Sequence, residues 1–429
     1  MTPKKSLGGI LLTVCALFLG STAAANTTPK PLFRGDNFFV AHSNRVAKQT
    51  QRVSANVTFA MIMTRFSGMP EALSVGSLYQ VVAGDGATVL IQDHNTQYTV
   101  PQSAVRELTV SPQPSTPVKM IGGKVILGFA DGTTSQYASN FSDPLSLFSP
   151  LSYNVGSGGT VAGNFPAALS EQAHQRGIQV WPILASGFNP IQTNAILQSE
   201  QAKWNILTSV LAKVEQDGVD GINLDFEDME PNDAPLLTQF AQDLRDVLHT
   251  TGKGLSIDVT PPSSDPHWGI VYNRPQLAQI SDYLVVMTYD EHYAGDATPG
   301  SVASLPWMES SITSTIDTGV APSKVLVGIP FYARTWYKVG GSLQSSAVAI
   351  TDEQGLSNSS GSSSVWNAHT QQDILNYTQH GTSFTMWLEN QRSLSERAQY
   401  VEKTGLAGVA IWQLELGTTA DVIDLSSQF

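Results

Sequence analysis

The chain has 429 residues, of which 41% are hydrophobic and 14% charged, a composition that excludes a largely disordered protein. Its length is too great for one small domain and accommodates a barrel of about 250 residues with an accessory module. The formal charge of -13 argues against a nucleic-acid partner, because proteins of that class present basic surfaces to phosphates.

Residues 1–25 have the pattern of a secretory signal peptide: two lysines, a mostly apolar stretch over residues 7–20, and three alanines ending at Ala25. A membrane-spanning helix needs about 20 apolar residues, more than this stretch offers, so we expect export and cleavage. A lipoprotein attached through Cys15, the only cysteine, is the alternative. Cleavage after Ala25 would leave 21 basic and 36 acidic residues, a charge of -15.

Residues 26–110 begin irregularly and then show the pattern of a small β module. The turn sequences at 84–86 and 93–95 separate three short predicted strands, at residues 78–82, 88–91 and 97–100. The run from Leu78 to Pro101 resembles a bacterial SH3-like module. The proline-rich residues 111–118 cannot hold regular hydrogen-bonded structure, so we interpret them as a linker and place the domain boundary there.

From residue 119 onward, strand-like apolar runs alternate with helical patterns, which is typical of a parallel βα fold. The candidate strands are residues 125–129, 147–153, 178–184, 221–227, 255–259, 283–289, 325–332 and 409–414. Eight strands in this pattern predict a closed α/β barrel, the (β/α)8 or TIM barrel, over residues 119–429.

The helix after the fourth strand has the clearest signals. We expect Asp233 as its N-cap and Gly252 just past its end. Its apolar positions recur at helical spacing: Leu236, Leu237, Phe240, Ala241, Leu244, Val247 and Leu248. Between strands seven and eight, residues 338–404 form an oversized connection, interpreted as an α+β subdomain inserted at the barrel rim. Within it we expect Glu389 and Arg392 to pair with each other or with a neighbouring loop.

The most informative segment is Val219-Asp220-Gly221-Ile222-Asn223-Leu224-Asp225-Phe226-Glu227, in which apolar and polar side chains alternate. In a strand this period places Asn223, Asp225 and Glu227 on one face, about 6 to 7 Å apart. A half-exposed strand with a solvated polar face would alternate in the same way. The flanking glycines, the bulky apolar face and the helix that follows favour a buried polar face. Catalytic residues of such barrels gather where strands end, so we expect Glu227 there.

This segment resembles the signature of glycoside hydrolase family 18. The run Met287-Thr288-Tyr289-Asp290 at the end of the sixth strand, Gly328-Ile329-Pro330-Phe331-Tyr332 at the end of the seventh and Trp412 at the end of the eighth also match. The resemblance covers most of residues 119–429. It implies a glycosidase that needs no metal or cofactor.

Two further segments, 287–295 and 386–394, resemble the bacterial spore-cortex and cell-wall branch of that family, whose members cleave peptidoglycan glycans. The chain departs from the commonest chitinase pattern, Asp-x-x-Asp-x-Asp-x-Glu, because Asn223 stands at the middle aspartate. That branch often has asparagine there. On the third strand, residues 185–188 match the family's Ser-x-Gly-Gly poorly, so no sugar contact is carried over from them.

The resemblance implies a retaining, substrate-assisted mechanism, in which the acetamido oxygen of the substrate is the nucleophile rather than a second carboxylate. Glu227 would then protonate the leaving oxygen. Asp225 would hydrogen-bond both to Glu227 and to the acetamido N–H. Two close carboxyls resist double ionisation, which keeps one of them protonated near neutral pH. Tyr289 would donate its hydroxyl to the acetamido carbonyl.

The same resemblance implies a sugar-binding surface around these residues. Trp412 would form an apolar floor for the sugar ring, and Met287 and Asp290 would line the same subsite. Asn223 would hydrogen-bond Asp225 without adding a charge. Each residue also has a structural alternative, since aromatic residues at strand ends often cap a barrel core. His292 lacks a second ligand at metal spacing, and we interpret it as a loop hydrogen-bonding residue.

We therefore expect an exported, monomeric hydrolase of β-1,4-linked N-acetylglucosamine glycans. Peptidoglycan is favoured over chitin by the branch resemblance and the SH3-like module. A non-catalytic glycan-binding protein, similar to a lectin, is the alternative, and the presence of Glu227 argues against it. A wall-associated structural protein on the same scaffold is a third hypothesis, which the intact Asp225, Glu227 and Tyr289 argue against.

Overall fold

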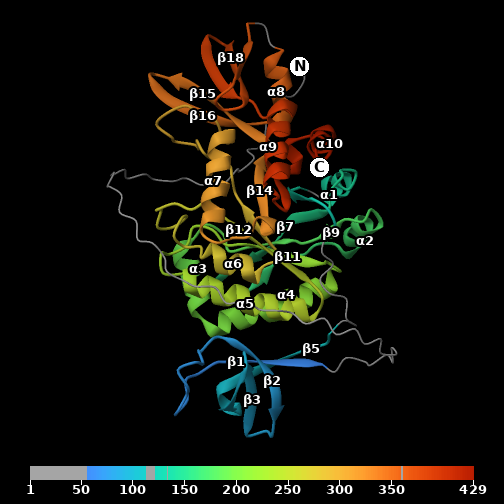
Figure 1. Ribbon diagram of the computed structural model, residues 1–429, viewed down its shortest axis with the longest axis vertical. Helices are drawn as coiled ribbons and strands as arrows, with labels where there is room; N and C mark the ends of the chain where they lie inside the picture. The colour runs from blue at the N-terminus through green and yellow to red at the C-terminus, as the bar shows by residue number, and fades with distance from the viewer. Residues whose placement is uncertain (1–55, 113–120, 133, 359–360) are drawn as a thin grey trace, which may run out of the picture.

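The structure, a computed structural model, describes residues 56–112, 121–132, 134–358 and 361–429 (Figure 1). In chain order it contains a five-stranded antiparallel sheet, a parallel barrel with surrounding helices, and a second five-stranded antiparallel sheet carried by the barrel. The predicted signal peptide, Cys15 and most of the predicted linker lie outside the described residues.

The barrel confirms the predicted α/β fold, since all eight predicted strands form and pair in parallel. They are β6 (Val125–Ala130), β7 (Leu147–Val155), β10 (Ile183–Ala185), β11 (Gly221–Asp225), β12 (Gly254–Val259), β13 (Tyr283–Val286), β14 (Val325–Pro330) and β20 (Gly408–Trp412). Pairing of β7 with β10 closes the barrel. The third predicted strand is split into β9 (Gln179–Val180) and β10, because Pro182 cannot donate to a ladder. A short β8 (Val161–Ala162) pairs antiparallel with β7.

Helices connect successive barrel strands. They are α1 (Thr134–Asn140), α2 (Ala167–Gln175), α3 (Pro190–Gln198), α4 (Glu200–Gln216), α5 (Ala234–Thr250), α6 (Arg274–Ile280), α7 (Leu305–Asp317) and α9 (Gln391–Thr404), followed by the final α10 (Thr419–Ser426). Three short 3-10 turns lie between them: η2 (Ser157–Gly159), η3 (Pro322–Lys324) and η4 (Leu414–Leu416).

The start of α5 corrects one expectation. Asp233 occupies the N-cap position, but its side chain does not cap the helix. It accepts instead from the Glu230 N–H at 3.1 Å and from Asn194 Nδ2 at 2.6 Å. The reason is that Asp233 already has helical backbone angles, φ -78° and ψ -16°, whereas a capping residue is extended. Gly252 follows the helix with φ +71°, as expected for its end.

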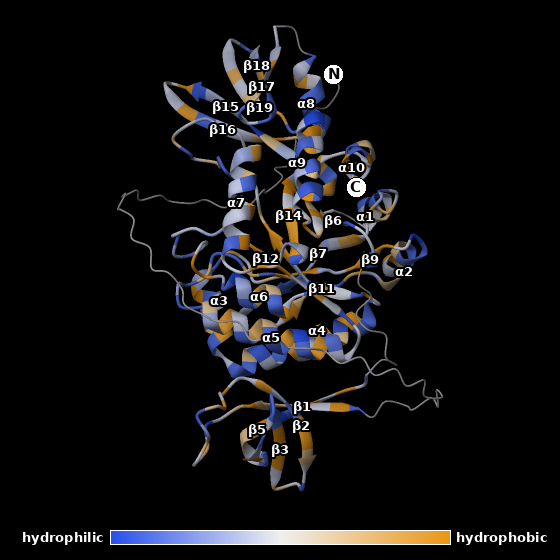
Figure 2. Ribbon diagram, viewed as in Figure 1, coloured by the Kyte–Doolittle hydropathy of each residue, from blue (hydrophilic) through white to orange (hydrophobic). Residues whose placement is uncertain are grey.

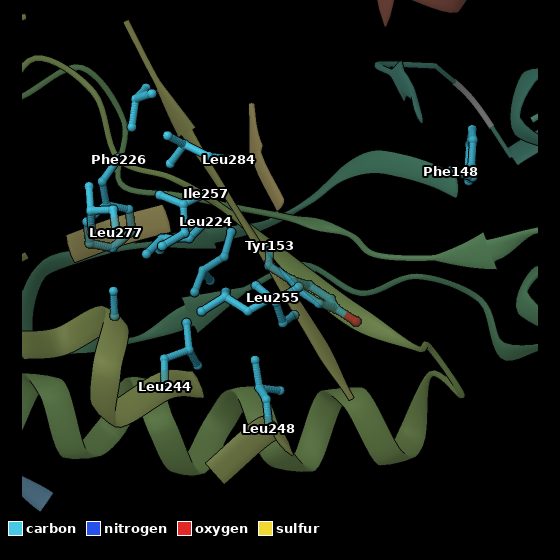
Figure 3. Packing of buried hydrophobic residues seen from close by; sticks show 14 of the residues in the cluster. Phe148, Tyr153, Leu224, Phe226, Leu244, Leu248, Leu255, Ile257, Leu277 and Leu284 are labelled. Carbon is cyan, nitrogen blue, oxygen red and sulfur yellow. The ribbon is translucent and has the colours of Figure 1, made fainter. Parts of the chain in front are cut away.

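The barrel strands alternate between an outer and an inner face. Figure 3 shows Leu224 of β11, Phe226 just after it, and Leu255 and Ile257 of β12 among the buried side chains above α5. The opposite residues face the barrel interior, where the apolar packing comprises Val125, Leu127, Phe129, Leu147, Trp181, Ile183, Tyr283, Val285, Leu326 and Ala410. Figure 2 shows how strongly apolar the barrel strands are compared with the striped helices α4 and α5.

Trp181 fills the end of the barrel where β11 and β12 begin. A Cβ at Gly221 would stand 2.7 Å from Trp181 Cδ2, and a Cβ at Gly254 would clash with the same indole. Both glycines are therefore required by close approach. Because apolar side chains close this end, the inward polar residues of β11 and β12 are confined to the opposite, C-terminal end.

The inserted α+β subdomain lies between β14 and β20, as predicted. Its sheet has the order β16-β15-β19-β18-β17. The elements are β15 (Tyr332–Val339), β16 (Ser342–Ala349), α8 (Ile350–Ser357), β17 (Ser363–Asn367), β18 (Gln372–Gln379) and β19 (Thr382–Trp387). β15 begins before the expected residue 338, and α9 packs back against the barrel strand β20.

The expected pairing of Glu389 with Arg392 is wrong. Glu389 Oε1 pairs instead with Arg397 Nη2 at 2.8 Å, and both side chains are fully buried. The Arg392 guanidinium lies 3.4 Å from the centroid of the Trp366 ring. The reason is that Arg392 sits on the exposed first turn of α9, whereas Arg397 lies on its buried face.

The N-terminal sheet has the order β4-β3-β2-β1-β5. Its elements are β1 (Val57–Ile62), β2 (Leu78–Gly84), β3 (Thr88–Asp93), β4 (Thr96–Pro101), η1 (Gln102–Ala104) and β5 (Val105–Val110). The strands predicted from the sequence form β2, β3 and β4, and the sequence missed β1 and β5. The SH3-like assignment of this sheet stays a prediction.

β1 escaped prediction because both of its faces are buried, which removes the alternation that marks a strand. Ala60 packs in the core of the N-terminal sheet, whereas Met61 joins the cluster that contains the barrel helices. Nearby, the Leu78 N–H donates to Asp243 Oδ1 of α5 at 3.2 Å. Figure 1 shows this sheet beside α4 and α5, on the side of the barrel away from the inserted subdomain.

Candidate functional site

The polar face of β11 runs from the barrel interior to its C-terminal opening. Asn223 is fully buried, whereas Asp225 and Glu227 are partly exposed. The intervening Leu224 and Phe226 are buried on the outer face, so the predicted alternation is confirmed. β11 itself ends at Asp225, and Glu227 follows two residues later, at the opening of the barrel.

The Asp225 and Glu227 carboxyls hydrogen-bond to each other. Burial raises the pKa of Asp225 to about 6. Burial, and after it the charge of Asp225, raises the pKa of Glu227 well above its ordinary value. Because two adjacent carboxylates resist double ionisation, the pair retains a proton near neutral pH. The arrangement can therefore deliver a proton to a group bound at the opening.

Asn223 corrects the sequence-based expectation, because it hydrogen-bonds the neighbouring strand and not Asp225. Its Nδ2 donates to Ser256 Oγ at 2.9 Å and to Asp258 Oδ1 at 2.8 Å, both on β12. Within the described part of the chain, neither Asn223 Oδ1 nor Asp225 Oδ1 has a hydrogen-bond partner. The reason is spacing: same-face residues of one strand are about 6.5 Å apart, but adjacent strands are only about 4.8 Å apart.

Asp258 is an acid of this site that the sequence analysis missed. It is 4% exposed and shares the inner face of β12 with Ser256. Burial, and after it the charge of Asp225, raises its own pKa well above the ordinary value. A third carboxyl therefore lies at the site, bonded to the uncharged Asn223 amide. The sequence signal was the alternation Ser256-Ile257-Asp258, the same period as in β11.

The residues after β13 form the next side of the site. Met287 is buried, whereas Tyr289 and Asp290 are partly exposed. Burial, and after it Asp258, raises the pKa of Tyr289 well above its usual range, so the phenol keeps its proton and can donate it in a hydrogen bond. Gly328 makes room for that ring, because a Cβ there would lie 2.9 Å from Tyr289 Cε1.

Asp290 is held by residues of the inserted subdomain. Tyr332 donates its hydroxyl to Asp290 Oδ1 at 2.6 Å, and the Tyr289 and Tyr332 rings meet edge to face at 6.5 Å. Burial raises the pKa of Asp290, an effect that Tyr332 and the positive charge of Arg334 oppose. Asp290 also has a left-handed backbone with φ +61°, a conformation uncommon outside glycine that often accompanies functional sites.

Arg334 is a second residue that the sequence analysis did not single out. It lies two residues after Tyr332 on the same face of β15 and is 3% exposed. Its Nη1 donates to Ser345 Oγ at 3.2 Å. Among the residues that the structure describes, no acceptor meets Arg334 Nε or Nη2. A buried guanidinium with unused donors is costly, so this group is suited to an acceptor supplied by a ligand.

Trp412 ends β20 and is partly exposed. Its ring meets Phe129 edge to face at 5.5 Å and packs on the interior barrel cluster. The ring thus caps the barrel core, which was the alternative to a sugar-binding role. Part of its surface remains exposed to solvent. At the end of β10, Phe188 is 44% exposed and stacks on Trp268 at 6.2 Å, which adds an aromatic pair not expected from the sequence.

His292 hydrogen-bonds Asp296 at 2.8 Å within one loop, in agreement with the interpretation of a loop hydrogen-bonding residue. Over residues 56–112, 121–132, 134–358 and 361–429, no group of three or more His, Cys, Asp or Glu side chains is arranged to hold a metal ion. The acids of the site lie close to one another, to Asn223 and to tyrosine side chains. The candidate chemistry is therefore proton transfer.

Comparison with known proteins agrees with this geometry. Residues 123–417 match the model of the family described as glycosyl hydrolases family 18. The putative sporulation-specific glycosylase YdhD of Bacillus subtilis (strain 168) is 28% identical over 291 residues, which are 65% of this chain and 67% of that protein. The cortical fragment-lytic enzyme of the same organism is 25% identical over 243 residues, which are 54% of this chain and 55% of that enzyme.

A solved structure has the same fold. The chitinase from Chromobacterium violaceum ATCC 12472 superimposes with a TM-score of 0.65 and 25% identity, over 71% of this chain and 99% of that one. The matched part of the chain is therefore the barrel with its inserted subdomain.

Proposed function

Because the chain belongs to glycosyl hydrolase family 18 and is a glycosidase, we propose that it cleaves β-1,4 bonds of N-acetylglucosamine-containing glycans at the C-terminal opening of its barrel, with peptidoglycan as the preferred substrate. The observation that carries the proposal is the hydrogen-bonded pair of Asp225 and Glu227 with raised pKa values, open to solvent and bordered by Tyr289.

Glu227 is the general acid of the proposed mechanism. It passes its proton to the glycosidic oxygen as the bond from that oxygen to C1 breaks, and the substrate's acetamido oxygen bonds to C1 to form an oxazolinium ion. Glu227, now a carboxylate, then takes a proton from the water that attacks C1 and opens the ring. The two displacements together retain the configuration at C1.

Asp225 and Tyr289 hold the acetamido group during these steps. The Asp225 carboxylate accepts the acetamido N–H and hydrogen-bonds Glu227. The Tyr289 hydroxyl, whose raised pKa keeps its proton in place, donates to the acetamido carbonyl oxygen. Such prepositioned donors stabilise developing charge without reorganisation.

Trp412, Met287 and Asp290 complete the proposed subsite. The partly exposed Trp412 ring offers a flat apolar surface to a sugar, and the buried Met287, after β13, adds an apolar side chain to the proposed subsite. Asp290, fixed by Tyr332 at 2.6 Å, accepts a sugar hydroxyl.

Arg334 supports peptidoglycan over chitin. Its two unused nitrogens lie on the face of β15 that also presents Tyr332 to the site. Peptidoglycan carries carboxylates on its peptides, and on any lactyl ether that bears no peptide, whereas the chitin repeat carries none, and a guanidinium pairs best with a carboxylate. The names of the sporulation-specific glycosylase and the cortical fragment-lytic enzyme point the same way.

We also propose that the chain is exported by residues 1–25 and acts at the cell wall. The N-terminal sheet, which follows, would be an SH3-like accessory module, joined to the barrel by residues 111–118. Within the described ranges, no helix is both long enough and apolar enough to cross a membrane.

The test replaces Glu227 with glutamine and follows new reducing ends from purified peptidoglycan and from N-acetylglucosamine oligomers. We expect Glu227→Gln to lose about two to four decades of rate, as for other general acids. Glu230→Gln, the same change three residues along the chain, is the matched control and should retain activity.

Three outcomes would overturn parts of the proposal. A Glu227→Gln variant as fast as the wild type would remove the general-acid assignment. A wild type that binds both polymers but releases nothing would favour the lectin-like alternative. Cleavage of chitin oligomers alone, with intact peptidoglycan, would make the substrate preference wrong.

A further inference from the structure

Asp258 is the buried acid of the site to which the proposed mechanism gives no role. It reaches the site from β12, whereas Asp225 ends β11 and Glu227 follows two residues later. The β11–β12 register sets Asn223 opposite Ser256, so Asp258 stands one inward position nearer the opening. The bond from Asn223 Nδ2 to Asp258 Oδ1, at 2.8 Å, links the two polar faces.

We propose that Asp258 is a positioning residue of the catalytic centre, which fixes the Asn223 amide and, through its charge, keeps a proton on the Asp225–Glu227 pair up to higher pH. The inference rests on the proposed function, because it concerns the proton that Glu227 donates.

Asp258 holds the Asn223 amide in one orientation. Both N–H groups of Asn223 Nδ2 are used, one by Ser256 and one by Asp258, so the amide cannot turn without losing two hydrogen bonds. Its Oδ1 therefore points away from Asp258 as a free acceptor in the buried centre, and Asp225 Oδ1 is likewise without a partner among the described residues. Asp258 thus fixes the orientation of an uncharged amide at the buried base of the site.

Asp258 also acts on the site through its charge. The groups that interact electrostatically with Asp258 are Asp225 at the end of β11, Glu227 just after it, Tyr272 after β12 and Tyr289 after β13. Further charged and titratable groups surround these: Arg274 acts on Tyr272, and Asp290, Tyr332 and Arg334 are linked to Tyr289. Among ion pairs of the described residues, none includes Asp225, Glu227 or Asp258. The three carboxyls therefore oppose one another's ionisation without a cation in contact.

The charge of Asp258 is among the causes that raise the pKa of Glu227, so Glu227 loses its proton against an ionised Asp258 as well as an ionised Asp225. In the wild type the last proton of the cluster leaves against two carboxylates, whereas without the Asp258 charge it leaves against one. Like charges within about 4–6 Å shift a pKa by one unit or more, so the loss of one charge lowers the pH at which the pair becomes fully ionised.

The experiment compares Asp258→Asn with Asp243→Asn. The two changes are chemically identical, and Asp243 is as deeply buried, at 1% exposure, but lies on α5 against the N-terminal sheet. The measured quantity is kcat/KM as a function of pH, on whichever glycan the wild type cleaves. We expect the alkaline limb of Asp258→Asn to move down by about one pH unit or more, and that of Asp243→Asn to stay in place.

A relocation variant separates charge from packing. The double change Asn223→Asp with Asp258→Asn moves the acid from β12 to β11 and restores three carboxyls, so its alkaline limb should return toward the wild type. Asn223→Asp alone adds a fourth carboxyl and should move the limb up. A purely structural Asp258 would lower activity equally at all pH values in every variant.

The failures are distinguishable. If the wild type cleaves neither polymer, the proposed function fails. If it cleaves and the alkaline limb of Asp258→Asn coincides with the wild type, this inference alone is overturned. If Asp258→Asn does not fold, the Asn223→Asp variant tests the inference instead. An alkaline limb of kcat/KM that is unmoved or lowered in that variant contradicts the inference.

Discussion

Two clusters of buried acids in this chain differ in the groups that contact their carboxyls. In the inserted subdomain, Glu389 is fully buried and accepts from Arg397 Nη2 at 2.8 Å, Gln372 Nε2 at 2.6 Å and Ser393 Oγ at 3.1 Å. At the opening of the barrel, Asp225 and Glu227 have each other, and Asp225 Oδ1 has no partner among the described residues. Only the first cluster contains a cation in contact.

The difference separates a structural acid from a chemical one. Burial raises the pKa in both clusters, to about 7 for Glu389 and to about 6 for Asp225. A shifted pKa therefore does not identify the functional cluster by itself. What distinguishes the barrel cluster is unused hydrogen-bonding capacity at a partly exposed position, where a substrate can supply the missing partners.

The largest effect should come from breaking the structural cluster. Arg397→Met leaves Glu389 buried without its cation, and we expect a loss of about 3–5 kcal/mol in the free energy of unfolding, measured by denaturant titration. The double change Arg397→Met with Glu389→Gln should recover part of this loss, because no uncompensated charge remains.

Arg392→Met is the matched control for that experiment. It removes the exposed arginine of the same helix, which contacts only the Trp366 face, and should cost less than about 1 kcal/mol. Equal losses in the two variants would show that the Glu389–Arg397 pair is not what stabilises this region.

Tyr289→Phe should have the next largest effect, and on activity rather than stability. The change removes one donor to the acetamido oxygen, for which we expect about a hundredfold loss in kcat with a smaller change in KM. Tyr337→Phe, on the inserted sheet, is the control and should leave both constants unchanged. A loss confined to KM would reassign Tyr289 to ground-state binding.

Asp225→Asn should have a smaller effect on stability than Arg397→Met, and one that depends on pH. The folded pKa of about 6 exceeds the ordinary value of 3.8, so this carboxyl costs nothing below about pH 4 and destabilises the fold as pH rises through 6. Asp225→Asn should therefore raise the melting temperature at pH 8 but not at pH 4, in calorimetric scans.

The same substitution at an exposed acid, Asp131→Asn, provides the reference for that scan. Its melting temperature should track the wild type at both pH values. If Asp225→Asn stabilises the fold equally at pH 4 and pH 8, ionisation of the buried Asp225 carboxyl is not what destabilises the wild type.

Several features of the fold followed from the sequence because they are local. The alternation of residues 221–227 assigned the inner and outer faces of β11, and the apolar runs located all eight barrel strands. β1 was missed because both of its faces are buried, and a strand without a polar face has no period to detect. The capping role of Asp233 failed because its backbone is already helical.

The candidate site also contains some residues that local sequence patterns predicted and others that they did not. Strand-end motifs brought together Asp225, Glu227, Tyr289, Asp290 and Trp412, which the structure gathers at one end of the barrel, although their roles stay predictions. The partner of Asn223, the presence of Asp258 and the unused donors of Arg334 were not foreseen. Each depends on a neighbour distant in sequence.

The order of apolar and polar residues in the chain sets the period of each strand, and with it which side chains share a face. Which faces meet depends on how the strands pair in the folded barrel. Residues two apart on a strand are about 6.5 Å apart, but the adjacent strand is about 4.8 Å away, so the nearest polar partner of an inward residue comes from the next strand. That is why Asn223 bonds Asp258, from a strand 30 residues or more along the chain, rather than Asp225 beside it.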